Sequence, residues 1–405
     1  MIGKKNKSIC LFTSSFPFGD HETYLISEVR VLSEVFERVF IFPMHVSGSP
    51  RKTPNNVKIE IFDNCYSSNR FFLLKNNFGE IITELFIEII LNGGWKRSFI
   101  KQLDYLLKYN YLANELVNFI DKNKNLDFYF YSYWLDEWAT TLAISKKRKI
   151  ISNYISRAHG FDIYNFRKNN MTFPFRLLQL KTVSSVYCVS ENGKNYLLNN
   201  THKKYKSKIK LSYLGTDDFG PSKIKSNSSC KLIVSVSNAY PIKRLNLILD
   251  SLLLCSSNIK WVHIGDGPQI KVLKDRLKLI SENIKIEFHG QKQNHEVIDF
   301  LSSNYIDAFV NVSISEGLPV SIMEAISLGI PVIATDVGGV KEIVNEVTGI
   351  LIKTDIKKAQ LSNILDGINT TYDLLPNDRK GIRNFWVENF NAKKNYYEFC
   401  KMLIN

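Results

Sequence analysis

The sequence has few cysteines, and their spacing gives them no shared role. The six cysteines are scattered over 405 residues, with no C-x-x-C pair and no histidine at metal-ligand spacing. Neither a disulfide-stabilised secreted scaffold nor a zinc site shows such a pattern. The sequence therefore fits a protein of a reducing cytoplasm.

Long uncharged apolar runs are also missing. The nearest, IITELFIEIIL at residues 81–91, carries Glu84 and Glu88 and is shorter than the roughly 20 residues that span a bilayer. At the N-terminus the apolar run extends only from Ile9 to Phe12, which is too short for a signal peptide. We expect a cytoplasmic protein, soluble or peripheral at the inner face of the cell membrane.

Three further signatures are absent. Gly265 and Gly267 do not complete the G-x-G-x-x-G pattern of a dinucleotide site. No aspartate-rich metal motif is evident, so we expect neither a metal nor another cofactor. The net charge of +14 would suit nucleic acid, but no aromatic RNA-stacking strand or recognition module accompanies it, so we expect no nucleic-acid partner.

What the sequence does have is a strongly uneven charge. Residues 1–215 hold 31 lysines and arginines against 18 acidic residues, whereas residues 216–405 hold 22 against 21. Such asymmetry suggests that the first half faces an anionic partner. Basic and aromatic residues mix between Asn69 and Lys108, for example at Trp95. This mixture suggests an interfacial membrane surface, although a packed helix with a solvated basic face would look similar.

The length and the alternation of patterns indicate two domains. With 44% apolar residues, 405 residues suit two cores better than one. Buried strands and helices alternate six times over residues 231–352, which predicts a doubly wound parallel sheet. Glycines and a proline near residues 215–221 mark the boundary. We expect domains at 1–215 and 216–384, and a C-terminal helix at 385–405 that packs back on the first.

The first half opens with a strand at residues 8–13, a loop, and a helix with apolar residues at helical spacing. Glu22 lies at the end of this loop, at the carboxyl edge of the expected sheet, where such sheets hold ligands. Two interpretations stay open. Glu22 either favours the N-terminus of the helix electrostatically or faces a ligand, on the acceptor side of the cleft.

The densest chemical signal is residues 313–339, SISEGLPVSIMEAISLGIPVIATDVGG. An apolar run before Glu316 predicts a buried strand, and the chain then turns into a helix that should end near Leu328. Glu316 would lie in the loop, beside free backbone N–H groups that attract an anion, and Glu324 about a turn inside the helix. Taken singly, these glutamates would be a helix cap and a solvated residue. Together they suit a diphosphate flanked by hydroxyl-rich sugars, and predict a sugar nucleotide.

This segment resembles the E-x7-E motif of the family 4 retaining glycosyltransferases, which have the GT-B fold, α/β with two facing Rossmann-like domains. The resemblance implies that Glu316 contacts the transferred sugar and Glu324 the ribose. It also implies that four backbone positions lie near the sugar and diphosphate: Gly317, Leu318, Pro319 and Val320.

The same resemblance assigns a loop near residue 240 to the diphosphate. Lys243 and Arg244 lie there, and cations would offset the charge that grows on the leaving group. Many relatives carry an arginine where this sequence has Asn238, so Arg244 or Arg157 would supply the second charge. A strand exit at His289 and Gly290 lies where the family holds the nucleotide base, although His289 could equally be an ordinary strand-end residue.

Residues 157–164, RAHGFDIY, resemble a motif of bacterial members that assemble exopolysaccharide, O-antigen or capsule. In those members a histidine at this strand end meets the transferred sugar. His159 is therefore predicted to be catalytic, beside Glu316 and Lys243. Arg157 and Asp162 are predicted to line the acceptor side of the cleft.

The sequence thus predicts a retaining, metal-independent transfer of a sugar from a nucleotide-sugar to a saccharide acceptor. We expect the acceptor to be linked to a lipid and the reaction to belong to the biosynthesis of a bacterial surface polysaccharide. An anionic membrane surface is an expected partner. Two rivals stay open, a sugar-nucleotide epimerase of the same architecture and an inactive scaffold of an assembly complex. The sugar, the base, the linkage and the acceptor depend on pocket shape, which no motif gives.

Overall fold

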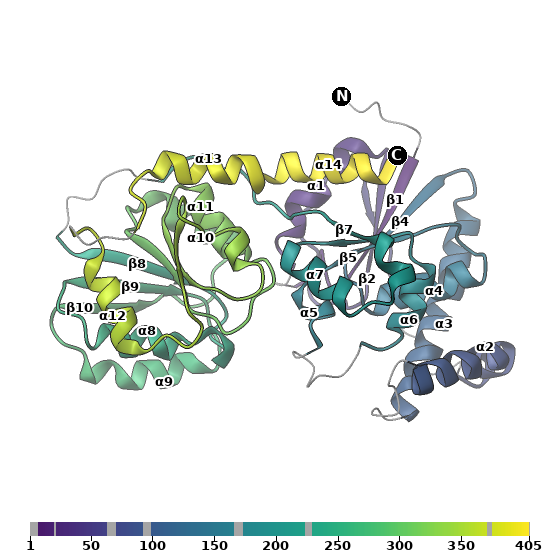
Figure 1. Ribbon diagram of the computed structural model, residues 1–405. Coiled ribbons are helices and arrows are strands. Elements are labelled where there is room, and N and C mark those ends of the chain that lie inside the picture. The colour runs from purple at the N-terminus through teal and green to yellow at the C-terminus, as the bar shows by residue number, and fades with distance from the viewer. Residues whose placement is uncertain are drawn as a thin grey trace. The chain divides into compact units, whose positions relative to one another are not determined.

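In a computed structural model of the chain, the described residues are 7–19, 22–62, 70–91, 99–165, 173–222, 229–370 and 375–404. They form two compact units (Figure 1). Unit 1 comprises Met1–Ser212 and Tyr396–Asn405, and unit 2 comprises Tyr213–Asn395. The C-terminal segment that the sequence set apart at 385–405 is therefore divided between the two units.

Unit 1 contains a parallel sheet of seven strands in the order β3-β2-β1-β4-β5-β6-β7. The interior strand β1 is buried along nearly its whole length, as expected of a parallel sheet covered on both faces. The strands are β1 Lys7–Thr13, β2 Arg38–Pro43, β3 Val57–Ile59, β4 Asp127–Ser132, β5 Ile155–Ala158, β6 Ser185–Cys188 and β7 Ile209–Leu211.

The helices of unit 1 connect these strands and bury the sheet. They are α1 Leu25–Val35, α2 Arg70–Leu91, α3 Phe99–Lys122, α4 Glu137–Lys147, α5 Gly160–Ile163, α6 Arg176–Thr182 and α7 Glu191–Asn199. Aromatic residues fill much of the core, where Phe42 packs against Phe12, with ring centroids 4.7 Å apart, and against Phe119 of α3 at 5.0 Å. Ser190 is the N-cap of α7, since its side chain accepts from the N–H of Gly193.

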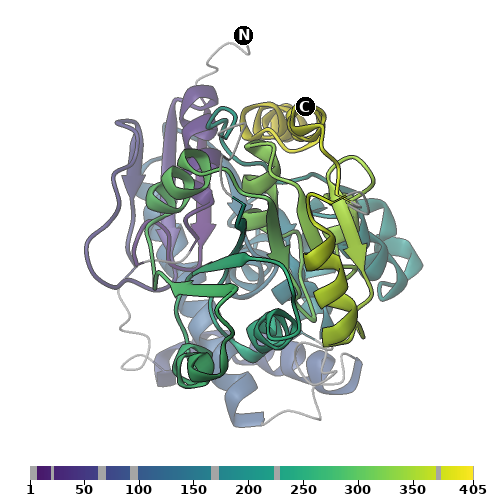
Figure 2. The same ribbon diagram turned by 90° about the vertical axis from the view of Figure 1, so that its left-hand side faces the viewer.

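Unit 2 contains a parallel sheet of six strands in the order β10-β9-β8-β11-β12-β13. The strands, green to yellow in Figure 2, are twisted as in other parallel sheets. They are β8 Lys231–Val236, β9 Ile259–Ile264, β10 Ile284–Phe288, β11 Ala308–Asn311, β12 Val332–Thr335 and β13 Gly349–Ile352. The predicted alternation of six strands with helices is confirmed.

Helices cover both faces of this second sheet, with α8, α9 and α12 on one face and α10 and α11 on the other (Figure 1). Their bounds are α8 Leu245–Leu252, α9 Gln269–Asp275, α10 Asn294–Ser303, α11 Val320–Ser327 and α12 Lys358–Gly367. Pro319 is the N-cap of α11, with ψ of 114°. In both units the predicted doubly wound, Rossmann-like fold is confirmed.

The C-terminal segment forms two helices where the sequence suggested one. They are α13 Arg379–Asn389 in unit 2 and α14 Ala392–Ile404, which ends in unit 1. Phe390 lies between them because the chain there leaves the helical conformation, with φ of −130°. Among the described residues no helix is long and apolar enough to cross a membrane.

Candidate functional site

The order of strands in unit 2 reverses between β8 and β11, because β8 continues to β9 on one side while β11 lies on its other side. Open α/β sheets hold ligands beyond the carboxyl ends of the strands at such a switch point. Two residues that the sequence predicts to be catalytic lie at this switch point, Lys243 after β8 and Glu316 after β11.

These two side chains form an ion pair. Lys243 Nζ lies 2.6 Å from Glu316 Oε1, and Asn311 Nδ2 donates to the same oxygen at 3.3 Å. The Glu316 side chain is 11% exposed and that of Lys243 is 24% exposed, so both reach solvent only in part. The structure thus joins two residues that the sequence proposed separately as catalytic, and adds Asn311, which the sequence analysis missed.

Arg244 fastens the loops of this edge to one another. Its backbone is left-handed, with φ of 51°, and the side chain donates from Nε to the Val312 carbonyl and from Nη1 to the Thr354 carbonyl, both at 2.6 Å. The loops after β8, β11 and β13 are therefore tied together. Two of the three guanidinium nitrogens serve the main chain, so Arg244 has less capacity for a diphosphate than the sequence suggested.

The loop after β12 packs against the main chain around Glu316. Gly339 N–H donates to the Gly317 carbonyl at 2.8 Å. Gly338 has a φ of +56°, and a Cβ atom there would lie 2.0 Å from the Glu316 carbonyl oxygen. Any side chain at this position would displace the Glu316 loop, so Gly338 is a site-shaping residue.

Glu324 is buried in α11. It is therefore not the solvated surface residue that a single glutamate in a helix would be expected to be. Asn294, the first residue of α10, donates from Nδ2 to Glu324 Oε1 at 2.7 Å. Burial raises the pKa of Glu324 from 4.5 to about 7, although the Asn294 hydrogen bond opposes the shift. A carboxyl group held near its titration midpoint at neutral pH is typical of functional sites.

The remaining donor-side predictions fall on the loops after β8 and β10. Asn238 is exposed. His289 directly follows β10, where Nε2 lies 3.1 Å from Glu287 Oε2 and the ring packs edge-on against Phe300. Gly290 has a φ of +69° and its carbonyl accepts from Gly265 N–H at 2.8 Å. These residues lie at the carboxyl edge of the sheet, as predicted.

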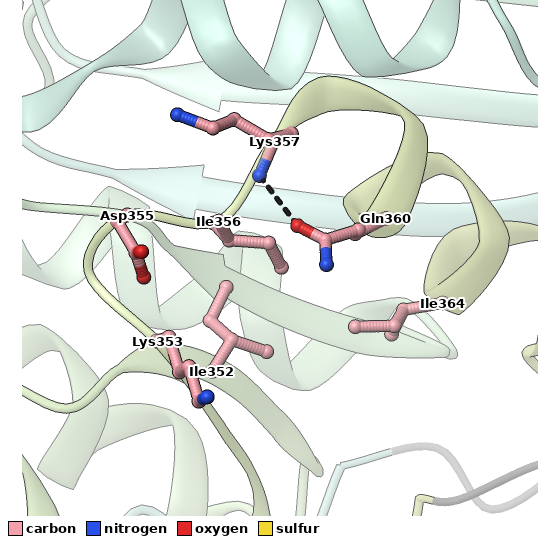
Figure 3. Close-up of a pocket in the computed structure, with 7 residues that line it drawn as sticks. All are labelled: Ile352, Lys353, Asp355, Ile356, Lys357, Gln360 and Ile364. Carbon is pink, nitrogen blue, oxygen red and sulfur yellow. Dashed lines mark hydrogen bonds between the residues drawn. The ribbon is translucent and has the colours of Figure 1, made fainter.

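A cavity of about 420 Å³ opens at the carboxyl end of β13, at the opposite end of the sheet from β10 (Figure 3). Three isoleucines and the polar residues of the loop into α12 line it: Ile352, Lys353, Asp355, Ile356, Lys357, Gln360 and Ile364. The Lys357 N–H donates to Gln360 Oε1 at 2.9 Å. None of the residues predicted to bind the donor lines this cavity.

In unit 1 the switch point lies between β1 and β4, and His159 follows the adjacent strand β5. The ring of His159 is buried against Trp134 and Tyr133, with centroids 4.4 and 4.7 Å away. Its Nε2 lies 3.1 Å from the Tyr133 carbonyl, which can only accept, so Nε2 carries the proton. Burial, followed by the charge of Arg157, lowers the pKa of His159 to about 3, and the ring is neutral near pH 7.

Asp162 positions this histidine and does not line a cleft, so the prediction for it is corrected. It is fully buried, and its carboxylate accepts from His159 N–H at 2.5 Å and from Leu135 N–H at 2.8 Å. Burial raises the pKa of Asp162 to about 6. The residue therefore ties the loop after β5 to the loop after β4.

The prediction that Arg157 faces a ligand is wrong. Its side chain is fully buried, pairs with Glu28 at 3.3 Å, and donates to the Tyr131 hydroxyl at 2.7 Å and to the Ser212 carbonyl at 2.9 Å. The guanidinium lies over the ring of Phe399 in α14, 4.0 Å from its centroid. Arg157 is therefore a core residue that holds α14 in unit 1.

Glu22 was predicted either to favour the N-terminus of the following helix or to face a ligand, and its side chain does neither. The residue has a φ of 55°, and its side chain folds back onto the loop after β1. The carboxylate accepts from the backbone N–H groups of Ser14, Ser15 and Phe16 at 3.2, 2.7 and 2.7 Å. It also accepts from Trp134 Nε1 at 2.5 Å. Glu22 therefore fixes the loop after β1 and orients the indole that packs on His159.

Comparisons with known proteins agree with this arrangement. Residues 218–372 match the family model described as glycosyl transferases group 1. The chain is similar to TuaC of Bacillus subtilis (strain 168), named as a teichuronic acid biosynthesis glycosyltransferase, with 39% identity over 30% of this chain and 29% of that protein. It is also similar to WcaL of Escherichia coli (strain K12), named as a colanic acid biosynthesis glycosyltransferase, with 28% identity over 34% and 36%. The matches thus span about a third of these relatives.

Similarity to solved structures extends over nearly the whole chain. The structure of HepE (Alr3699) of Anabaena, in complex with UDP and glucose, has a TM-score of 0.67 and 15% identity. The alignment covers 98% of this chain and 99% of that one. At this identity the likeness shows the fold, which is GT-B. The resemblance to glycosyltransferases of GT-B fold that the E-x7-E motif indicated is confirmed: residues 218–372 match the glycosyl transferases group 1 family, within a chain of GT-B fold.

Proposed function

We propose that the chain is a glycosyltransferase that takes a sugar from a nucleotide-sugar bound by unit 2. The observation that carries this proposal is the Lys243–Glu316 ion pair at the switch point, followed directly by α11 with its buried Glu324. A cation, a helix N-terminus and two carboxylates suit a diphosphate between two sugars. The complexes of HepE with UDP and with UDP-glucose support a donor of this class.

In the proposed reaction, the bond between the sugar's anomeric carbon and the diphosphate breaks while the acceptor hydroxyl attacks that carbon. Lys243 and the N–H groups at the start of α11 stabilise the negative charge that develops on the diphosphate. The acceptor's proton passes to a diphosphate oxygen on the same face, which retains the anomeric configuration. Glu316 accepts from sugar hydroxyls, and Glu324 accepts from the ribose. The role of His159 at the transferred sugar stays a prediction, for a side chain that is neutral near pH 7.

We also propose that the transfer needs no metal ion, because Lys243 and the start of α11 provide the charge stabilisation that a metal would give. Among the described residues no group of three or more histidines, cysteines, aspartates or glutamates is placed to hold a metal. Full activity in excess chelator supports metal independence. Loss of activity in chelator with recovery on adding manganese refutes it.

We propose a saccharide acceptor, lipid-linked in the assembly of a bacterial surface polysaccharide. The names of TuaC and WcaL, which refer to teichuronic acid and colanic acid, support this class of product. The excess of basic residues in the first half suits an acceptor that sits at the anionic inner face of the cytoplasmic membrane.

An exposed apolar stripe on α2 supports this peripheral location. Ile82, Phe86 and Ile90 repeat every four residues, and Phe86 is 64% exposed. Figure 1 shows α2 beside α3, whose first residues Phe99 and Ile100 are also exposed. We call these five residues the α2–α3 apolar patch. Exposed apolar residues on an otherwise basic unit suit an anionic lipid surface.

The buried side of α2 combines apolar and acidic residues, since Ile81 and Leu85 are buried in the core of unit 1. Glu84 and Glu88 are buried, where Glu84 Oε1 pairs with Lys147 at 2.6 Å and Glu88 accepts from Phe175 N–H at 2.9 Å. The acidic residues that interrupt the apolar run therefore face the protein. Trp95, Lys96 and Arg97, which also suggested a membrane surface, lie outside the described residues.

The test is a screen of the purified chain against a panel of nucleotide-sugars, read by thermal shift and by release of nucleotide. Binding of one donor by the wild type, with loss of nucleotide release in Glu316→Gln but not in Glu346→Gln, supports the proposal. Glu346 is an exposed acid of the same unit and serves as the matched control. Conversion of the donor to an epimer without an acceptor indicates the epimerase, and binding of no donor at all leaves only a scaffold.

Retention has its own readout. With the donor known, the anomeric configuration of the product is measured by proton NMR from the coupling at the anomeric carbon. An α-linked donor should give an α-linked product. Inversion would contradict the same-face mechanism without affecting the assignment of the donor site.

A further inference from the structure

A second cavity, of about 540 Å³, lies in unit 2 at the opposite edge of the sheet from Lys243 and Glu316. Tyr305, which lines it, precedes β11, and Leu328 directly follows α11, which has returned the chain to the amino edge. Cavities of this size suit a small molecule. The loops of the proposed donor site all follow the carboxyl ends of the strands, so this cavity is separate from them.

The lining of this cavity is basic. Arg379, Lys380 and Arg383, all from the first turns of α13, contribute to it, and the lining includes no aspartate or glutamate. Asp378, the N-cap of α13, is engaged with Gly381 N–H. Arg383 is occupied by an ion pair with Asp218 and a hydrogen bond to the Ser327 carbonyl. Arg379 and Lys380 line the cavity and have no acidic partner among the described residues.

Arg379 is held in place but is only partly paired. Its guanidinium lies over the ring of Tyr305, 4.1 Å from the centroid, and Nη2 donates to the Ile306 carbonyl at 2.6 Å. Nη1 is buried and has no hydrogen-bond partner among the residues that the structure describes. A buried donor on a charged group is costly to leave unpaired.

Ser222 presents a second unpaired group on the same cavity. The residue is only 5% exposed, and its backbone is fixed because its N–H donates to the Leu328 carbonyl at 3.0 Å. The Oγ atom is buried and, within the described ranges, has no hydrogen-bond partner. Buried hydroxyl groups are nearly always paired in native structures.

We propose that this cavity binds a small phosphate monoester. On binding, the Arg379 guanidinium and the Ser222 hydroxyl, buried at the cavity wall, turn so that Nη1 and Oγ donate to the phosphate oxygens, and Lys380 adds a further positive charge. A dianion suits two unpaired cations better than a monocarboxylate does. Pro221, Tyr305 and Leu328 supply an apolar wall for the organic part of the ligand. The site is independent of the donor site and of the proposed reaction.

The experiment titrates the full chain with inorganic phosphate, phenyl phosphate and benzoate by isothermal calorimetry. Phenyl phosphate should bind about tenfold more tightly than inorganic phosphate, because its ring gains the apolar wall, and benzoate should bind more weakly than phenyl phosphate. Ser222→Ala and Lys380→Gln should each weaken phenyl phosphate by about fivefold or more. Lys358→Gln, an exposed lysine on α12, is the control and should change nothing.

Arg379→Gln should abolish binding of phenyl phosphate. If this variant does not fold, Ser222→Ala and Lys380→Gln test the proposal. The same titration of Lys243→Ala separates this cavity from the donor site, because its affinity for phenyl phosphate should equal that of the wild type. The proposal is overturned by a Lys243→Ala variant that no longer binds, by Ser222→Ala and Lys380→Gln variants that bind like wild type, or by no binding up to about 20 mM.

Discussion

Asn294 donates its side-chain amide to Glu324 across 2.7 Å, and so links the start of α10 to a buried carboxyl group in α11. The hydrogen bond favours the charged form of Glu324, whereas burial favours the neutral form and dominates. The pKa of about 7 lies in the physiological range. Ribose hydroxyls need the ionised carboxylate as acceptor, so donor affinity should depend on pH.

We predict that nucleotide affinity rises as pH increases from 6 to 8 in the wild type. Asn294→Ala removes the interaction that lowers the pKa of Glu324, so the midpoint of this rise should move to higher pH. Glu324→Gln cannot titrate, and its affinity should be flat over this range. The measurement is a calorimetric titration at several pH values with UDP-glucose, whose diphosphate has no group that titrates over this range. A wild-type profile as flat as that of Glu324→Gln contradicts the role of this carboxyl group.

The same shift makes a prediction for stability, with a definite sign. The pKa of Glu324 is raised on folding from 4.5 to about 7, so the native state holds its proton more tightly than the unfolded state. The stabilising contribution is complete below pH 4.5 and is lost as pH rises to 7. Glu324→Gln should therefore gain stability relative to the wild type as pH increases from 5 to 8. Urea unfolding at these pH values measures the difference.

The Lys243–Glu316 pair gives a prediction on catalysis. Glu316→Gln keeps the size of the side chain but removes its charge, and Lys243→Ala removes the cation beside the proposed leaving group. We expect each change to lower kcat by about 100-fold or more, with a smaller effect on KM, because both act on charge that develops in the transition state. Turnover assays with the donor found by screening measure the split. If kcat/KM falls only because KM rises, while kcat stays the same, these residues contribute to binding and not to the chemical step.

Much of this site could be predicted from the sequence because its residues lie in short strand-loop-helix segments. A buried strand, a turn and a helix place Glu316 and Lys243 at the sheet edge whatever the distant contacts are. Arg157 also follows this local pattern, but its side chain is buried because it contacts Glu28, 129 residues away, and Phe399 of α14. No local pattern shows such partners. For the same reason the sequence did not predict the role of Asn294, which contacts Glu324 from another helix.

Glu22 shows a second limit of local reasoning. Its position before α1 predicted a helix-end or ligand role, yet a left-handed backbone turns the carboxylate onto three N–H groups of its own loop. We predict that Glu22→Ala costs about 2 kcal/mol or more in the free energy of unfolding, since these groups lose their acceptor. Glu37→Ala, an exposed acid of unit 1, is the control and should cost little. Urea denaturation compares them, and equal stabilities would show that water replaces the carboxylate.

The buried Glu28–Arg157 pair should show strong coupling. Removing one partner leaves the other charge buried and unpaired, so Glu28→Gln and Arg157→Met should each destabilise unit 1 by about 3–5 kcal/mol. The double variant should be less destabilised than the sum of the two, because neither charge remains. A double-mutant cycle by urea denaturation measures the coupling. Additive effects would mean that the two side chains are stabilised by other neighbours.

The α2–α3 apolar patch yields a prediction about membranes. Replacing Ile82, Phe86 and Ile90 with serine removes the large exposed apolar side chains of residues 79–90, and should weaken binding to vesicles of phosphatidylglycerol and phosphatidylcholine by about tenfold or more. Val272→Ser, which changes an apolar residue of unit 2 that is 61% exposed, should have no effect. Sedimentation with vesicles gives the affinity. Added salt should weaken binding of the wild type, because basic residues contribute.

Two outcomes would argue against a lipid surface as the partner of this patch. The triple variant retaining wild-type vesicle binding would show that charge alone holds the protein to the membrane. A dimeric wild type that becomes monomeric on the same substitutions would identify a second copy of the chain as the occupant, and analytical ultracentrifugation distinguishes this case. Because Glu84 and Glu88 are engaged inside unit 1, serine substitutions on the opposite side of α2 should leave its packing intact, so lost binding can be assigned to the exposed stripe.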